Sequence, residues 1–249
     1  QGSFTISLIS PMSVTGFEKY RVGPQVPGVR FVPFGQVPEV GSDTAAVILE
    51  PIQSMAGVRV APPEYYRDLR RYATENGIIL IFDEVQTGFG RTGRWFAGMH
   101  WDVEPDLMTL AKGIGGGFPV GALVANQAIA EATASGDHGS TFGGGPVAMA
   151  AVEATIDLIR GEGLVENAGN VGDEIRRRLA AHPRVSDVRG LGLLIGIDFD
   201  RPAREIRDRL LEQGILVGTS IPPETVRLLP PLGIGSAEVE RFFEALERI

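Results

Sequence analysis

Cysteine is absent from the 249-residue sequence, and histidine occurs only three times. Without cysteine there are no disulfides, no thiolate metal sites and no cysteine nucleophiles, as is typical of proteins from a reducing cytoplasm. The histidines, His100, His138 and His182, are far apart along the chain, which argues against a metal site. We therefore expect a cytoplasmic protein without a bound metal.

Long apolar runs are missing as well. No segment approaches the roughly 18 apolar residues that span a bilayer, and residues 1–4 lack the basic and apolar stretches of a signal peptide. The net charge of -8 is spread along the chain, which argues against nucleic acids and anionic membranes as partners. The hydrophobic content of 43% is enough for one large core or two smaller ones.

Lysine is almost absent, since the 23 basic residues are 21 arginines and only two lysines, Lys19 and Lys112. Arginine serves wherever positive charge alone is needed, so a retained lysine can be there for its amine. Lysine can form an imine, or act as a base when its pKa falls, and arginine can do neither. Lys19 lies among charged residues and fits a surface position, which leaves Lys112 as the candidate for a chemical role.

Apolar strands alternate with a helix between residues 43 and 126. Near-continuous apolar runs predict strands buried on both faces at 45–52 and 78–85, and further strands are predicted at 107–112 and 120–126. Pro62 and Pro63 begin a predicted helix that ends at Asn76 and Gly77. This alternation predicts an α/β fold with a mostly parallel sheet and flanking helices.

The pattern changes after Pro146. Helices are predicted over 146–160 and 164–181, then a strand and turn over 185–199, a helix over 202–213, an extended segment at 226–228 and a final helix with Ser236 as its N-cap. We interpret residues 1–146 as part of a large domain, and residues 147–249 as a linker helix with a small C-terminal α+β domain.

Three charged residues, Glu50, Asp83 and Lys112, lie at the carboxyl ends of predicted strands, where ligands bind to parallel sheets. A buried carboxylate such as Asp83 needs a cation or donors beside it, and a protonated pyridine nitrogen is one such partner. The glycines at 113 and 115–117 permit close approach of the backbone to a flat cofactor, and positive φ. Strand-end acids and glycine-rich loops also occur as ordinary turns, so these residues leave that alternative open.

A series of ordered motifs extends over nearly the whole chain: EPIQ (50–53), FDEVQTGFGRTG (82–93), PD (105–106), TLAKG (109–113), HGSTFGG (138–144), VRGLGL (188–193) and VRLLPPL (226–232). Together these motifs resemble those of the class III aminotransferases of fold type I, which depend on pyridoxal 5′-phosphate. Within this class the sequence is most similar to the acetylornithine and ornithine aminotransferases.

The resemblance implies a role for each residue that would hold the cofactor ring. Lys112 would be the Schiff-base lysine and would later carry the proton between substrate atoms. Asp83 would pair with the pyridine nitrogen, with Glu50 supporting the site, and Gln86 would bind near the ring oxygen. Phe4 matches an aromatic residue that stacks on the ring.

Further residues are implied for the phosphate and the substrate. Thr141, with its neighbour Ser140, would reach across a homodimer interface to the phosphate of the other subunit. Arg227 would bind a substrate carboxylate through its bidentate guanidinium. Without these roles, Thr141 would be an ordinary turn residue and Arg227 would be a surface residue of a strand. The sequence leaves both alternatives open.

The implied reaction moves an amino group from an N-acetylornithine-like or other ω-amino donor to a 2-oxo acid such as 2-oxoglutarate. Two alternatives stay open: an aminomutase or decarboxylase with the same cofactor, and a truncated chain that does not bind cofactor.

Three departures from the family pattern bear on these expectations. The sequence begins after the N-terminal arm, the early sheet elements and the glycine-containing helix start that cups the phosphate. Residues 5–8 stand where the family carries a substrate-binding arginine. Met55 stands where ornithine-type enzymes have a glutamate that gates the second substrate arginine. The missing glutamate weakens the assignment of ornithine as the donor, and the sequence does not name the donor.

Overall fold

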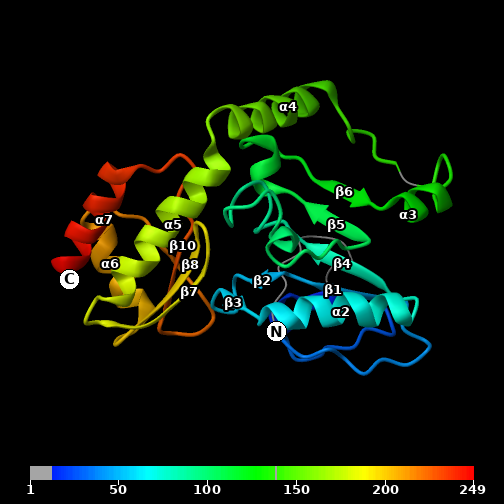
Figure 1. The fold of residues 1–249 in the computed structure, drawn as a ribbon, viewed down its shortest axis with the longest axis horizontal. Helices are drawn as coiled ribbons and strands as arrows, with labels where there is room; N and C mark the ends of the chain where they lie inside the picture. Colours follow the sequence, from blue (N-terminus) through cyan, green and yellow to red (C-terminus); the bar gives the residue numbers. More distant parts are fainter. Residues whose placement is uncertain (1–12, 138) are drawn as a thin grey trace.

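The computed structural model describes residues 13–137 and 139–249, which form two four-stranded sheets with surrounding helices (Figure 1). The first sheet has the order β1-β4-β5-β6, the second has the order β7-β8-β10-β9, and β2 and β3 form a separate hairpin. The strands are β1 (Ala46–Leu49), β2 (Ile52–Gln53), β3 (Arg59–Val60), β4 (Ile79–Asp83), β5 (Leu107–Leu110), β6 (Ala122–Ala125), β7 (Val185–Leu191), β8 (Leu194–Phe199), β9 (Gly218–Thr219) and β10 (Thr225–Leu228).

Helices cover both sheets, and none in the described part of the chain is long and apolar enough to cross a bilayer. The α-helices are α2 (Pro63–Glu75), α3 (Gln127–Ala132), α4 (Pro146–Gly161), α5 (Leu164–Ala180), α6 (Ala203–Glu212) and α7 (Ser236–Glu247). The 3-10 turns are η1 (Glu18–Tyr20), η2 (Ala97–His100) and η3 (Lys112–Gly115).

The first sheet confirms the predicted α/β class, because β1, β4 and β5 run parallel and only β6 runs antiparallel to its neighbour. The predicted first helix is α2, which begins after Pro62 and buries Tyr66 and Leu69 against this sheet. Tyr66 also stacks on Trp101, with 3.5 Å between ring centroids. This apolar layer supports the sheet whose strand ends carry the charged residues.

Some predicted strand properties are wrong. The strand predicted at 45–52 ends at Leu49, because Pro51 has no N–H to continue the ladder, and it is not buried on both faces, since Ile48 is 41% exposed. The strand predicted at 107–112 ends at Leu110, because Lys112 has a left-handed backbone that no strand accepts.

The predicted N-cap of the last helix is also wrong. Ser236 is the first residue inside α7, and Gly235 occupies the N-cap position. The backbone N–H of Gly235 donates to the Glu238 carboxylate at 3.0 Å, which supplies the helix start without a serine cap.

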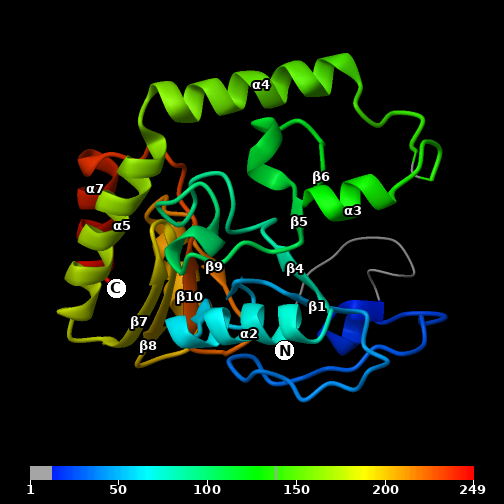
Figure 2. The same cartoon turned by 45° about the vertical axis from the view of Figure 1, so that its right-hand side comes forward.

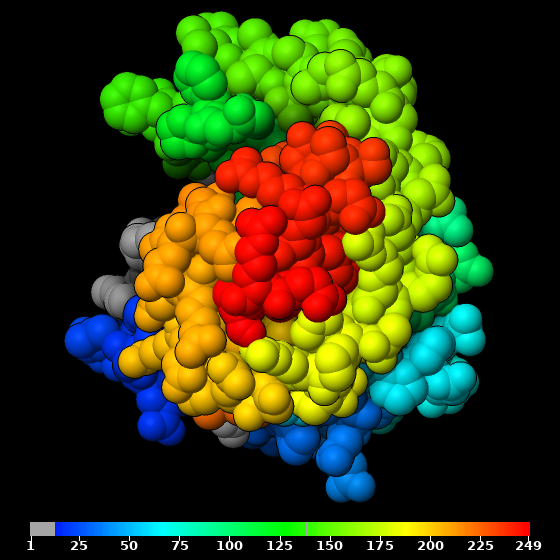
Figure 3. All heavy atoms as spheres, turned by 90° about the vertical axis from the view of Figure 1, so that its left-hand side faces the viewer, coloured from blue at the N-terminus to red at the C-terminus, as the bar shows by residue number. Residues whose placement is uncertain are grey.

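The second sheet is antiparallel, and its strands have two different faces. Ile195, Ile197 and Val226 point into a core shared with α5, α6 and α7. The alternate residues of the same strands therefore point the other way, towards the first part of the chain. Figure 3 shows α7 at the centre of the outer surface formed by these helices.

α4 extends above the first sheet and leads into α5 beside the second sheet (Figure 2). Ile159 of α4 packs with Phe89, Leu110 and Ile114, which lie around the end of β5. We propose that the boundary predicted at residue 146, the first residue of α4, divides the chain into its two domains.

Candidate active site

Glu50, Asp83 and Lys112 lie at the same edge of the first sheet. In the parallel ladder Leu49 pairs with Phe82, so Glu50 and Asp83 lie level, one residue further along. Asp83 in turn pairs with Thr109, and Lys112 follows Thr109 by three residues. The carboxyl ends of three neighbouring parallel strands thus bring two acids and one amine to one edge.

Asp83 is only 6% exposed, and neighbouring donors fix its carboxylate. Its Oδ1 accepts hydrogen bonds from the Val85 N–H and from the Thr109 hydroxyl, each at 3.1 Å. These bonds hold the carboxylate in one orientation. The sequence did not single out Thr109, because the register between β4 and β5 that places it beside Asp83 leaves no local pattern.

Lys112 combines a strained backbone with a desolvated amine. Its φ of 51° is left-handed, which costs about 1–3 kcal/mol for a residue other than glycine and is typical of functional sites. The Lys112 residue is exposed overall, yet the protein around its amine lowers its pKa through desolvation, while the charges of Asp83 and Glu50 raise it and that of Arg227 lowers it further. A lowered pKa increases the fraction of neutral amine, the nucleophilic form.

Two of the four glycines that follow Lys112 have the positive φ that the sequence permits, whereas Gly113 and Gly115 do not. Gly116 and Gly117 have φ values of 57° and 109°. A Cβ on Gly116 would lie 2.7 Å from the Thr155 hydroxyl of α4, so the turn can lie against this helix only without a side chain there.

Glu50 is buried, with 5% of its surface exposed, and one carboxyl oxygen is left over. Oε2 accepts a hydrogen bond from the Ser54 N–H at 3.4 Å, whereas Oε1 has no partner within 13–137 and 139–249. Desolvation, reinforced by the charge of Asp83, raises the pKa of Glu50 to about 8, against opposing effects of Ser54, Lys112 and Arg227. This raised pKa favours the protonated carboxyl, and that form can donate a hydrogen bond.

This raised pKa predicts a pH dependence of stability. The folded protein keeps a proton on Glu50 that the unfolded chain loses above about pH 4.5. The contribution of Glu50 to the free energy of unfolding is therefore fully present below about pH 4.5, and it is lost as the pH rises towards about 8. We expect the difference in free energy of unfolding between the wild type and Glu50→Gln to shift in favour of the variant over this interval. Denaturant unfolding at several pH values measures it, with the exposed Glu39→Gln as control. A difference that is constant with pH would contradict the prediction.

Arg227 reaches the same group from the second sheet. Its Nε donates to the Thr219 carbonyl at 3.1 Å and its Nη1 donates to the Ser54 hydroxyl at 2.7 Å. Desolvation lowers its pKa, while the charge of Glu50 raises it. Arg227 forms no ion pair with any described residue, and three of its five N–H donors have no described acceptor, including both on Nη2. A half-buried guanidinium with donors to spare suits an incoming carboxylate.

The remaining predicted site residues make no described contact with these four charged residues. Gln86 is half-buried three residues after Asp83, and Ser140 and Thr141 are exposed in the loop before α4. In the described part of the chain, no hydrogen bond joins these three side chains to Glu50, Asp83, Lys112 or Arg227. Their predicted contacts with the ring oxygen and with a second subunit's phosphate stay predictions, and Phe4 lies outside the described residues.

Ser54 lies in the candidate site, and the sequence did not identify it as a site residue. It is completely buried, its N–H binds Glu50 and its hydroxyl binds Arg227, so it links the two sheets at the site. The only sequence signal is its position beside Met55, where the family pattern is interrupted.

The mostly parallel sheet, with a lysine and a buried acid at neighbouring strand ends, has the fold of the pyridoxal-phosphate-dependent transferases. Residues 34–249 match the family model described as aminotransferase class-III. The chain belongs to the class III aminotransferase family.

Similar proteins agree with this assignment. The acetylornithine aminotransferase of Methanothermobacter thermautotrophicus is 40% identical over 100% of this chain and 66% of its own length. That of Mycobacterium leprae is 45% identical over 90% of this chain and 57% of its own length. The chain thus spans between 57% and 66% of the length of these curated relatives.

Solved structures show the same fold. The ornithine aminotransferase of Toxoplasma gondii has a TM-score of 0.89 and 29% identity, covering 97% of this chain and 60% of that protein. The acetylornithine aminotransferase of Elizabethkingia anophelis has a TM-score of 0.76 and 35% identity, covering 82% of this chain and 55% of that protein.

Proposed function

We propose that the protein is a pyridoxal-phosphate-dependent aminotransferase that moves an amino group from an N-acetylornithine-like or other ω-amino donor to 2-oxoglutarate. The observation that carries this proposal is the desolvated amine of Lys112, held at a strained backbone position and coupled to the buried carboxylate of Asp83. The similarity to proteins named acetylornithine aminotransferase supports the donor class.

The residues present fit the cofactor in charge and chemistry. Lys112 would hold it through its amine, and Asp83, oriented by Thr109, would face the pyridine nitrogen. Glu50 offers a buried oxygen without a described partner beside both. When bound, the cofactor supplies the electron sink that makes the substrate carbon acidic. The Nζ of Lys112 would then move the proton from that carbon, which its lowered pKa favours.

Arg227 would bind a carboxylate of the donor and of the acceptor. Its guanidinium is fixed by two uncharged acceptors, the Thr219 carbonyl and the Ser54 hydroxyl, and the side chain at position 55 is methionine. No acid at position 55 competes with the substrate carboxylate. We further propose a homodimer in which Ser140 and Thr141 bind the phosphate held by the other subunit, since both are exposed here.

The test is a screen of single half-reactions with acetylornithine, ornithine and 4-aminobutyrate as donors. We expect acetylornithine to convert the bound cofactor to its amine form at least about tenfold faster than ornithine, because Met55 cannot supply the charge that gates an ornithine site. Cofactor absorbance follows the conversion, and the released product is identified by mass spectrometry. Carbon dioxide in place of an oxo product would indicate a decarboxylase, and a protein that binds no cofactor would contradict the proposal altogether.

A further inference from the structure

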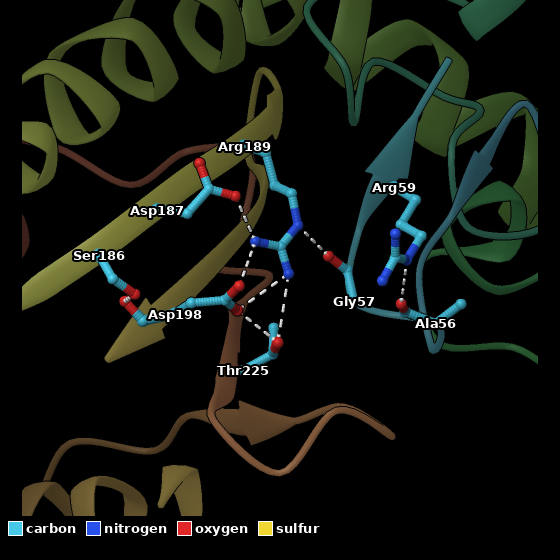
Figure 4. A network of polar contacts seen from close by, with 8 residues as sticks. All are labelled: Ala56, Gly57, Arg59, Ser186, Asp187, Arg189, Asp198 and Thr225. Atoms are coloured by element: carbon cyan, nitrogen blue, oxygen red, sulfur yellow. Dashed lines mark hydrogen bonds and ion pairs between the residues drawn. The ribbon is translucent and has the colours of Figure 1, made fainter. Parts of the chain in front are cut away.

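Arg189 on β7 uses its whole guanidinium within the protein (Figure 4). Its five N–H donors match five hydrogen bonds, so none is left for a ligand. The bonds are Nε to Gly57 O (2.6 Å), Nη1 to Asp187 Oδ2 (2.6 Å) and Asp198 Oδ2 (2.8 Å), and Nη2 to Asp198 Oδ1 (2.9 Å) and Thr225 Oγ1 (3.2 Å). Two of its partners are carboxylates, which form ion pairs with the guanidinium. Arg189 therefore has a different task from Arg227, which keeps donors to spare.

The two arginines lie in one row across the second sheet. Arg189 pairs with Gly196 of β8, and Gly196 pairs with Arg227 of β10. Directly paired residues point to the same face of a sheet, so both side chains flank Gly196 on the face opposite the helical core. A Cβ at position 196 would lie 2.9 Å from both the Gly57 carbonyl oxygen and the Val58 Cβ. The bare backbone of Gly196 thus forms a notch between the two arginines.

The turn of the β2–β3 hairpin, residues 54–58, fills this notch. Arg189 binds the Gly57 carbonyl on one side, and Ser54 at the other end of the turn binds Nη1 of Arg227. A third bond, from the Ile221 N–H to the Met55 carbonyl at 3.0 Å, ties the turn to the segment before β10. Val58 has a φ of 55°, a conformation that a β-branched residue adopts only when its surroundings hold it there. The position of the turn therefore depends on the contacts that grip it.

We propose that Arg189 is a positioning residue that seats the 54–58 turn in the Gly196 notch, so that Ser54 orients Arg227 for the carboxylate of a dicarboxylate acceptor. This inference rests on the proposed function, in which Arg227 binds that carboxylate. Thr225 contributes from the same strand as Arg227, because its hydroxyl accepts from Arg189 and donates to Asp198. The network therefore holds both the turn and the strand whose side chains must meet.

The experiment measures the KM for 2-oxoglutarate and kcat in the cofactor-loaded protein. Arg189→Lys keeps the positive charge but loses the planar guanidinium, which donates to several acceptors at once. We expect it to raise this KM about tenfold while kcat changes less than about threefold. Thr225→Val removes the hydroxyl that accepts from Arg189 and donates to Asp198, and it is expected to raise KM about threefold, which keeps the test valid if Arg189→Lys folds poorly. The matched control is Arg209→Lys on the exposed surface of α6.

Two further measurements, the absorbance of bound cofactor and the rate of a half-reaction, distinguish a positioning role of Arg189 from a purely structural one. The absorbance of bound cofactor should be unchanged in the Arg189 and Thr225 variants, and the half-reaction with a simple alkylamine, which has no carboxylate, should keep its wild-type rate. Arg227→Gln is the reference for a lost carboxylate site. If Arg227→Gln raises the KM and both positioning variants leave it at the wild-type value, the inference is overturned. If Arg227→Gln itself has no effect, the proposed carboxylate site fails, and the inference fails with it.

Discussion

Lys112→Ala is expected to lower aminotransferase activity by at least about a thousandfold, because in the proposed function this one side chain would both hold the cofactor and move the substrate proton. Loss of the near-visible absorbance band of the protein should accompany the loss of activity. Lys112→Arg should be just as inactive, since arginine keeps the positive charge but cannot form an imine or act as a base. Comparing the two variants separates the chemistry of the Lys112 amine from the effect of its positive charge, which interacts with Asp83 and Glu50.

The scarcity of lysine gives this experiment a matched control within the chain. Lys19 is the other lysine in the sequence, is exposed, and lies 4.8 Å from the centre of the Tyr20 ring. Lys19→Ala should keep the absorbance band and the activity. Borohydride reduction of the wild type should leave the cofactor covalently on the peptide that contains residue 112. Label on the Lys19 peptide, or an active Lys112→Ala variant, would refute the assignment.

The sequence could predict which residues follow the strands, because that information is local. Apolar runs ended by a charged residue predicted strand ends at Glu50, Asp83 and near Lys112, and all three lie at one edge of the sheet. Parallel pairing needs no further detail to bring such ends together. Strand lengths were predicted less well, since Pro51 and the left-handed backbone of Lys112 end β1 and β5 early.

The contacts that complete the site could not be predicted, because they join distant parts of the chain. Ser54 and Arg227 are 173 residues apart, and Arg189 and Gly57 are 132 residues apart. Their meeting depends on how the second sheet packs against the hairpin and on the missing side chain at Gly196. The exposure of Ile48 could not be predicted from the sequence either. An apolar strand has the same sequence pattern whether or not another element covers its face.

Asp83→Asn is expected to lower kcat by about a hundredfold or more. Asparagine keeps the shape of the side chain and can still accept from Thr109, but it has no negative charge to hold a proton on the pyridine nitrogen. The charge of Asp83 raises the pKa of both Lys112 and Glu50, so its removal should lower both pKa values. Carbonyl NMR of Glu50 in the cofactor-free protein would follow the second effect independently of catalysis.

Thr109→Val is the control that separates charge from orientation at Asp83. It removes the hydroxyl that donates to Oδ1, leaves the Val85 N–H in place and keeps the carboxylate. We expect it to lose about threefold to tenfold in kcat, as for one hydrogen bond, and so to stay well above Asp83→Asn. Equal losses in the two variants would mean that orientation alone matters. An Asp83→Asn variant with wild-type kcat would mean that another group faces the pyridine nitrogen, and the pairing of Lys112 with Asp83 around one ring would have to be abandoned.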